Sequence, residues 1–268
     1  MDMTFYYIYF ALVGLIIGSF LNVCIYRIPR EESIVRPPSH CPNCGNRLTF
    51  IDLVPVFSFL FLRGKCRHCS AKISPRYAMV ELLTSLIFVL LLYKYKLTVD
   101  FFAAAYLMSI LIAIFFIDLE HMIIPDGLVL AGLVGGIPLV VYNLFRPIEI
   151  YGDRNWWTPL VGMLSGFVVL LFIGLVGLLI YKTDEAMGGG DIKLFAPLGL
   201  FLGWKLIIVA FLLSVFSAAI VSVILIITKV KSRKSTVPFG PFIVIGTFIT
   251  YLYGWEILEW YLRSSIGS

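Results

Sequence analysis

The sequence predicts an all-α polytopic membrane protein with about eight transmembrane helices, the sixth of them short or broken. Hydrophobic residues make up 60% of the 268 residues and charged residues only 14%, and the mean hydropathy is +0.97. A soluble domain carries far more charge than this. The apolar residues also gather in stretches of about 20, which is the length of helix that spans a bilayer.

The net charge of +5 does not indicate nucleic-acid binding, because the basic residues are dispersed among the apolar stretches. In a membrane protein such residues report orientation instead. Arg27 is the first basic residue and follows the apolar run 5–25. The positive-inside rule therefore places the N-terminus outside the cell and Arg27 in the cytoplasm. We expect a lipid bilayer as a partner and no nucleic acid.

Eight apolar stretches are the expected spans: 5–25, 77–93, 101–117, 123–144, 159–181, 192–203, 206–228 and 239–262. The sixth stretch is short and contains Pro197, Gly199 and Gly203, which favours a broken or half-inserted helix. The expected domains are a first transmembrane helix (1–25), a cytoplasmic four-cysteine zinc module (26–76), a transmembrane core (77–262) and a C-terminal tail (263–268).

Two basic segments test this count of spans. One is 26–76 and the other holds Lys229, Lys231, Arg233 and Lys234. Both should be cytoplasmic, and the six spans expected between them satisfy this requirement. The same topology places Asp118 and Asp191 at the cytoplasmic face.

The pairs Cys41/Cys44 and Cys66/Cys69 are CxxC motifs, and four thiolates brought together suit a tetrahedral zinc ion. A redox dithiol is the alternative, but two matched pairs in an Arg-rich cytoplasmic segment favour metal. With four sulfur ligands the Zn²⁺ has no open position, so its predicted role is structural. His40 and His68 are expected to be neighbours of the site and not ligands.

Two acids lie at membrane borders. Asp118 directly continues the apolar run 110–117, and Asp191 follows the glycines 188–190. A carboxylate at membrane depth is energetically costly, which indicates a functional role. Asp191 could also be the N-cap of a helix that begins at Ile192, and this role is compatible with a functional one. For Asp126 a polar turn beside Pro125 is the favoured interpretation.

The residues around these acids could have either a functional or a structural role. Gly188, Gly189 and Gly190 would allow an extended substrate to approach the backbone. Lys193 could anchor the helix at the membrane surface or bias a nearby carboxylate towards its charged form. Glu81, within an expected span, could link helices by hydrogen bonds or border a site.

Two carboxylates a few ångströms apart cannot both ionise. The ionised one can take a proton from an attacking water, and the protonated one can donate to the carbonyl and then to the leaving amine. This chemistry is aspartyl proteolysis. A transporter is the alternative from another class. Two observations oppose it: both acids are expected at one face, and no paired broken helices occur in the two halves.

The chain resembles the prepilin peptidases, or type IV leader peptidases, of the GxGD group of intramembrane aspartyl proteases. The matching motifs, in chain order, are Gly18–Val23 with Tyr26–Pro29, the twin CxxC pairs, Ser74–Tyr77 with Glu81–Leu82, Asp118–His121 with Pro125–Asp126, Gly188–Lys193, and Pro238–Pro241. The resemblance implies Asp118 and Asp191 as the catalytic pair, and it separates Asp118 from Asp126.

The resemblance also implies a function. Its substrates would be type IV prepilins and pseudopilins in a bacterial inner membrane, cut after the glycine that ends a short basic leader. Members with the cysteine-bearing loop typically also methylate the new N-terminal residue with S-adenosylmethionine. A peptidase without methyl transfer is the nearest alternative. No cofactor fingerprint is readable, and Glu81 is the candidate cofactor-binding residue.

Overall fold

The computed structural model describes residues 3–181, 188–230 and 236–266. The chain divides into two compact units, Met1–Leu97 and Thr98–Ser268. The described part is helical and contains no named strand, only two isolated bridges in the cysteine module. This confirms the predicted all-α class. Of the expected basic run at 229–234, residues 231–234 lie outside the described residues.

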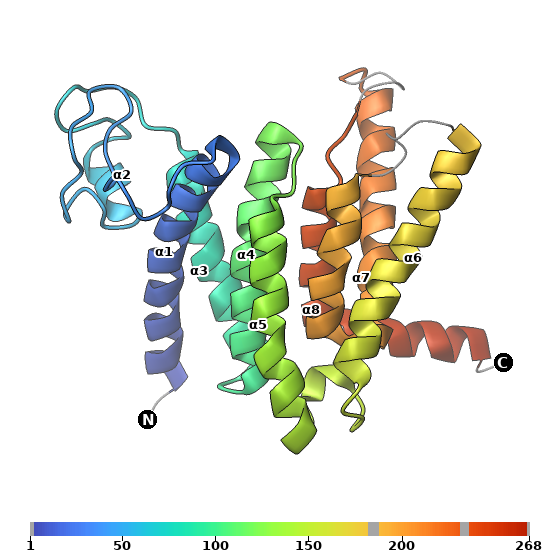
Figure 1. The fold of residues 1–268 in the computed structure, drawn as a ribbon. Coiled ribbons are helices and arrows are strands. Elements are labelled where there is room, and N and C mark those ends of the chain that lie inside the picture. The colour runs from blue at the N-terminus through green and yellow to red at the C-terminus, as the bar shows by residue number, and fades with distance from the viewer. Residues whose placement is uncertain (1–2, 182–187, 231–235, 267–268) are drawn as a thin grey trace. The chain divides into compact units, whose positions relative to one another are not determined.

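Unit 1 (1–97) contains two long helices and the cysteine module. Its elements are α1 (Met3–Arg27), η1 (Ile28–Arg30), α2 (Phe57–Phe61) and α3 (Arg76–Tyr95) (Figure 1). Helix α1 packs against α3. The contact is close because α1 presents glycines at 14 and 18: a Cβ at Gly18 would lie 2.6 Å from the Cα of Glu81. Such small-residue contacts are typical of helix pairs in membranes.

Unit 2 (98–268) is a helical bundle. Its elements are α4 (Val99–His121), α5 (Asp126–Phe145), η2 (Glu149–Tyr151), α6 (Thr158–Tyr181), α7 (Gly189–Ile227) and α8 (Gly240–Ile266). Helix α7 packs against α5, α6 and α8, and α4 packs against α5 and α8. These boundaries agree with the expected spans to within a few residues.

Helix α7 is broken at Gly203. This residue has φ 72° and ψ 173°, a conformation outside the helical region, in the middle of 39 residues that would otherwise extend about 58 Å. Figure 1 shows 189–202 and 204–227 as two separate helices, both reaching the same end of unit 2. The predicted broken span is therefore confirmed. The two expected spans 192–203 and 206–228 are the two parts of α7 on either side of this break.

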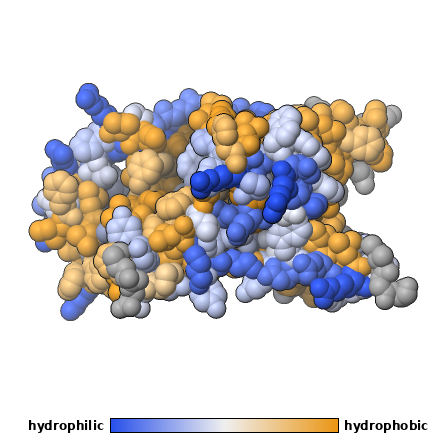
Figure 2. Space-filling model, turned by 90° about the horizontal axis from the view of Figure 1, so that it is seen from below, coloured by the Kyte–Doolittle hydropathy of each residue, from blue (hydrophilic) through white to orange (hydrophobic). Residues whose placement is uncertain are grey.

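Seven of the described helices are long and apolar enough to cross a membrane, which makes this a multi-pass membrane protein. Many large hydrophobic side chains on their outer faces are exposed, as a surface against lipid requires. Figure 2, a view from below, shows hydrophobic side chains over much of the surface, with hydrophilic ones interspersed among them. The tryptophans of the 145–158 connection, Trp156 and Trp157, are also exposed.

Candidate active site and metal centre

Asp118 lies in the last turn of α4 and its side chain is buried, with 5% of the residue exposed. Its Oδ2 accepts a hydrogen bond of 2.9 Å from the backbone N–H of Gly240, the first residue of α8. The apolar run that precedes Asp118 packs within the bundle, so α4 delivers this carboxyl to the end of the helix at a fixed depth.

Asp191 lies in the first turn of α7, close enough to Asp118 for the two charges to interact. The structure thus brings together the two acids that the sequence singles out. Helix α7 begins at Gly189 with Gly188 as its N-cap, and so Asp191 is not the N-cap residue. An acid in the first turn is still favoured there by the helix dipole.

The three glycines before Asp191 have different surroundings. A Cβ at Gly188 would lie 2.7 Å from Oδ2 of Asp191, and one at Gly190 would lie 2.9 Å from Cβ of Ile124. A Cβ at Gly189 would meet no atom of the described residues within 4 Å. A side chain at the first glycine would therefore displace the Asp191 carboxyl and one at the third would press on Ile124, whereas the described residues leave space at the second.

Lys193 lies one turn past the start of α7 and pairs with Asp126 at the start of α5. The Nζ–Oδ1 distance is 2.9 Å, and the two side chains are 54% and 74% exposed. An exposed ion pair contributes little to stability. Asp126 therefore differs from Asp118 in both burial and partner, as the polar-turn interpretation expects.

Gly240 is a site residue that the sequence reasoning did not single out. A Cβ there would lie 2.6 Å from Oδ2 of Asp118, so only glycine allows this backbone to reach the acid. The one sequence signal for Gly240 is its position in Pro238–Pro241, a motif that this chain shares with the prepilin peptidases. No spacing rule connects position 240 with position 118.

The four cysteines converge in unit 1. The Sγ atoms of Cys41, Cys44, Cys66 and Cys69 all lie within 4.8 Å of one another, and those of Cys41 and Cys69 are 3.9 Å apart. A tetrahedron with metal–sulfur bonds of about 2.3 Å has sulfurs separated by about 3.8 Å. The arrangement therefore fits a structural metal site, and no histidine belongs to the cluster in the described residues.

Two similar turns build this centre. The N–H of Cys41 donates to Asn46 O, and the N–H of Cys66 donates to Ala71 O, at 2.9 and 2.8 Å. Inward-pointing N–H groups then stabilise thiolates. The backbone N–H of Ala71, followed by the Asn43 amide, lowers the pKa of Cys69 to about 6. The N–H of Cys44 lowers the pKa of Cys41.

Opposing effects act on the pKa of Cys44. The N–H of Asn46 lowers its pKa, but burial and the neighbouring thiols outweigh this effect and raise it to about 11. A metal ion must therefore displace at least one proton when it binds the cluster.

Glu81, the candidate cofactor residue, lies in α3 of unit 1 and is 7% exposed. Its Oε2 accepts a 2.7 Å hydrogen bond from the N–H of Val56, and the Ser19 hydroxyl also bonds to this carboxylate. Glu81 belongs to unit 1, whereas Asp118 and Asp191 belong to unit 2. It borders a pocket of about 410 Å³ lined by unit 1 residues.

Family models match the two units in turn. The bacterial peptidase A24 N-terminal domain matches residues 12–95, and the type IV leader peptidase family matches residues 105–223. The boundary between these matches falls at the division between the two units. No solved structure matches the chain.

Curated relatives match almost the whole chain. A prepilin leader peptidase/N-methyltransferase of Bacillus subtilis is 34% identical, covering 95% of this chain and 97% of the relative. One of Aeromonas hydrophila is 36% identical, covering 96% and 95%, and one of Myxococcus xanthus is 36% identical, covering 85% and 66%. These matches confirm the resemblance seen in the sequence motifs, and the chain belongs to the type IV leader peptidase family.

Proposed function

We propose that this protein is an intramembrane aspartyl endopeptidase whose catalytic pair is Asp118 and Asp191. The observation that carries the proposal is the convergence of two acids from α4 and α7 at one end of unit 2. One of them is buried and held by the Gly240 N–H. Within the described residues, neither carboxyl accepts a hydrogen bond from a basic side chain, so the pair is free to share a proton.

The chemistry follows from this pair. The ionised carboxylate takes a proton from a water molecule while the oxygen of that water attacks the scissile carbonyl carbon. The protonated carboxyl donates its proton to the carbonyl oxygen. As the C–N bond breaks, the carboxyl that took the proton from water donates it to the leaving nitrogen, and the other carboxylate regains a proton from the tetrahedral diol. Neither a metal ion nor a nucleophilic side chain is needed for this sequence of steps. The described residues leave space at Gly189, near Asp191, which supports the approach of an extended peptide.

The substrates we propose are type IV prepilins and pseudopilins, which the names of the relatives support. A basic leader would lie at the cytoplasmic face of the inner membrane while the apolar pilin helix lies in the bilayer. We therefore propose that the acid pair lies at the cytoplasmic face. The charge pattern of the sequence supports the same orientation.

The second activity we propose is N-methylation of the new N-terminal residue, which the names of the relatives also support. S-adenosylmethionine supplies an electrophilic methyl group for this reaction, and the substrate amine supplies the electron pair. The four-cysteine centre would hold Zn²⁺, whose preference for tetrahedral thiolate sets fits the observed cluster.

The test is to incubate the purified protein with a prepilin and methyl-labelled S-adenosylmethionine. We expect a single cut after the glycine that ends the leader, located by N-terminal sequencing, and label on the mature product alone. Cleavage elsewhere, or none, would contradict the peptidase proposal. Cleavage without label would contradict methyl transfer and leave a simple peptidase.

A further inference from the structure

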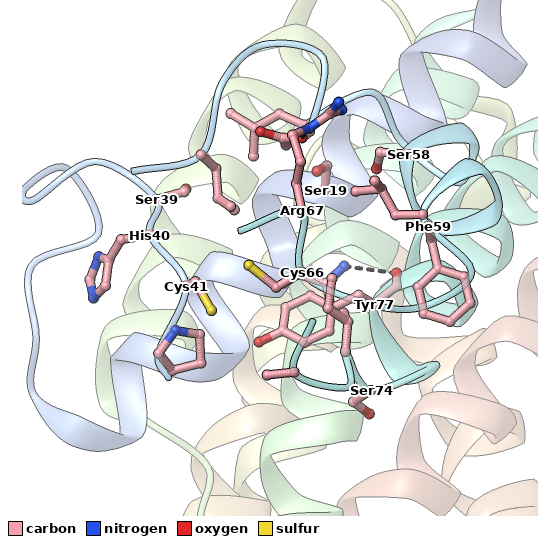
Figure 3. Close-up of a pocket in the computed structure, with 18 of the residues that line it drawn as sticks. Ser19, Ser39, His40, Cys41, Ser58, Phe59, Cys66, Arg67, Ser74 and Tyr77 are labelled. Carbon is pink, nitrogen blue, oxygen red and sulfur yellow. Dashed lines mark hydrogen bonds and ion pairs between the residues drawn. The ribbon is translucent and has the colours of Figure 1, made fainter. Parts of the chain in front are cut away.

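We propose that the pocket in unit 1 is the binding site of the methyl donor, S-adenosylmethionine. This inference rests on the methyltransferase activity proposed above and assigns it a place in the molecule. The pocket has a volume of about 410 Å³ and is lined by α1, the cysteine module and the start of α3 (Figure 3). Pockets for small cofactors have volumes of this order.

Hydrogen-bond acceptors lie at the α1–α3 side of the pocket. Glu81 brings a buried carboxylate, and Asn22, which is 3% exposed, lines the same pocket. The Asn22 amide nitrogen donates to Tyr77 O at 2.9 Å, but its Oδ1 is buried without a partner in the described structure. A buried acceptor without a partner is energetically costly, so this side favours a ligand with a positive charge or a hydrogen-bond donor.

Cationic side chains line other parts of the pocket. Arg27 is 6% exposed and donates to Ser33 O and Pro37 O, at 2.9 and 2.7 Å, through two of its five N–H groups. Arg67 also lines the pocket. Its Nε bonds to Asp52 at 2.7 Å, so its two terminal nitrogens can bind a ligand. Guanidinium groups bind carboxylates well.

Aromatic and aliphatic side chains complete the lining. Tyr77 and Phe59 offer ring faces, which suit a purine ring or a sulfonium cation. A methyl donor of this class combines a sulfonium, an ammonium, a carboxylate and a purine. The pocket offers a matching chemistry for each, so the residues present fit this cofactor.

The cysteine module forms part of the same wall, because Cys41 and Cys66 line the pocket. In Figure 3 these two cysteines lie beside the pocket together with Arg67 and Tyr77. A metal ion on the four sulfurs would therefore fix the shape of the donor site. This gives the zinc module a role in methyl transfer through positioning.

The first test uses the wild-type, zinc-loaded full-length chain. It is irradiated with methyl-labelled S-adenosylmethionine, and the labelled peptides are identified by mass spectrometry. We expect label within 19–27, 39–43 or 53–81. Label confined to 98–268 would overturn the pocket assignment while methyl transfer stands. No binding by wild type would contradict methyl transfer itself, and the pocket with it, without affecting the peptidase proposal.

The second test measures the dissociation constant for the same cofactor by equilibrium dialysis. Glu81→Gln keeps the shape and an acceptor for the Val56 N–H but removes the charge, and we expect binding about 10- to 100-fold weaker. Asn22→Leu should weaken binding in the same direction. Glu32→Gln, an exposed acid of unit 1 outside the pocket, is the matched control and should bind as wild type does.

Unchanged affinity in Glu81→Gln and Asn22→Leu would overturn the assignment. Zinc content of one ion per chain shows that each variant is folded. If a variant loses its zinc, the label map on the wild-type chain decides the question alone.

Discussion

Asp118 depends on a neighbour that must be glycine. The backbone N–H of Gly240 reaches Oδ2 at 2.9 Å, and a Cβ on this residue would come within 2.6 Å of the same oxygen. The hydrogen bond orients the carboxyl, and the missing side chain leaves it room. Catalytic geometry tolerates little displacement, since a shift of about 1 Å can lower a rate about 100-fold.

Gly240→Ala should therefore lower the rate of prepilin cleavage about 100-fold or more, measured by the appearance of mature pilin. Gly127→Ala is the matched control. A Cβ at Gly127 meets nothing within 4 Å, so cleavage should stay within about twofold of wild type. Normal cleavage by Gly240→Ala would show that Asp118 does not need this contact.

The two acids could be predicted from the sequence, but the contact between Asp118 and Gly240 could not. Asp118 and Asp191 could be selected because charge at a membrane border is costly and because the topology puts both at one face. Gly240 could not be selected, because its hydrogen bond joins positions 122 apart. The helix start at Gly189 was also missed, since a glycine run gives no sign of where a helix begins.

Helix packing depends on glycines at a few close contacts. In unit 1 the glycines at 14 and 18 let α1 approach α3, which brings Asn22 to the carbonyl of Tyr77. In unit 2 the chain reverses at Gly203, whose missing side chain leaves room for the Tyr151 ring. The spans could be predicted from apolar stretches, and the break from Gly203 and Pro197. The pairing of α1 with α3 could not, because apolar stretches do not specify their partners.

Gly18→Val should push α1 away from α3, because the added Cβ would lie 2.6 Å from Glu81 Cα. Overpacking of this kind costs about 1–3 kcal/mol. We expect a lower thermal unfolding temperature and weaker binding of S-adenosylmethionine. Ile16 lies on the same helix and is 63% exposed, so Ile16→Val should change neither the unfolding temperature nor the binding. Unaltered stability of Gly18→Val would mean that the close approach is unimportant.

Gly203→Ala should destabilise unit 2. Its φ of 72° with ψ 173° suits glycine almost alone, and a Cβ would lie 2.9 Å from the Tyr151 ring. The expected loss is about 1–3 kcal/mol in the free energy of unfolding, seen as a lower unfolding temperature in detergent. The same substitution at Gly127 should leave that temperature unchanged. An unaffected Gly203→Ala protein would contradict the reversal of α7 at this residue.

At the scale of the whole molecule, two sets of chemical groups belong to two units. The cysteine cluster, Glu81 and the 410 Å³ pocket belong to unit 1, and the acid pair belongs to unit 2. The family models divide the chain at the same place. The sequence predicted both the metal site and the acid pair, but a pocket built from 26–81 and α1 has no sequence pattern of its own.

Removal of zinc should therefore impair methyl transfer through loss of the donor site. Chelation should release one ion per chain, weaken S-adenosylmethionine binding and increase proteolysis within 31–75, because such modules fold with their metal. A lower pH should also favour release of the zinc ion. Protons compete with the metal for all four thiolates, so the affinity for zinc should fall as the pH falls.

The dissociation constant for Zn²⁺ measured between pH 7.5 and 5 checks this dependence, and it should rise as the pH falls. Asp118→Asn is the control, because its substitution lies in unit 2 and should leave zinc content unchanged. A zinc affinity that does not change with pH would contradict the thiolate set proposed for the metal.

The measurement that tests the central claim most directly is the rate of prepilin cleavage by three single variants. Asp118→Asn and Asp191→Asn remove one carboxyl each from the proposed pair, and Asp126→Asn removes an exposed carboxyl that pairs with Lys193. Loss of a positioned acid or base should slow cleavage at least about 100- to 10,000-fold in the first two. The third should stay within about twofold of wild type. Normal cleavage by either of the first two variants would contradict the assignment of Asp118 and Asp191 as the catalytic pair.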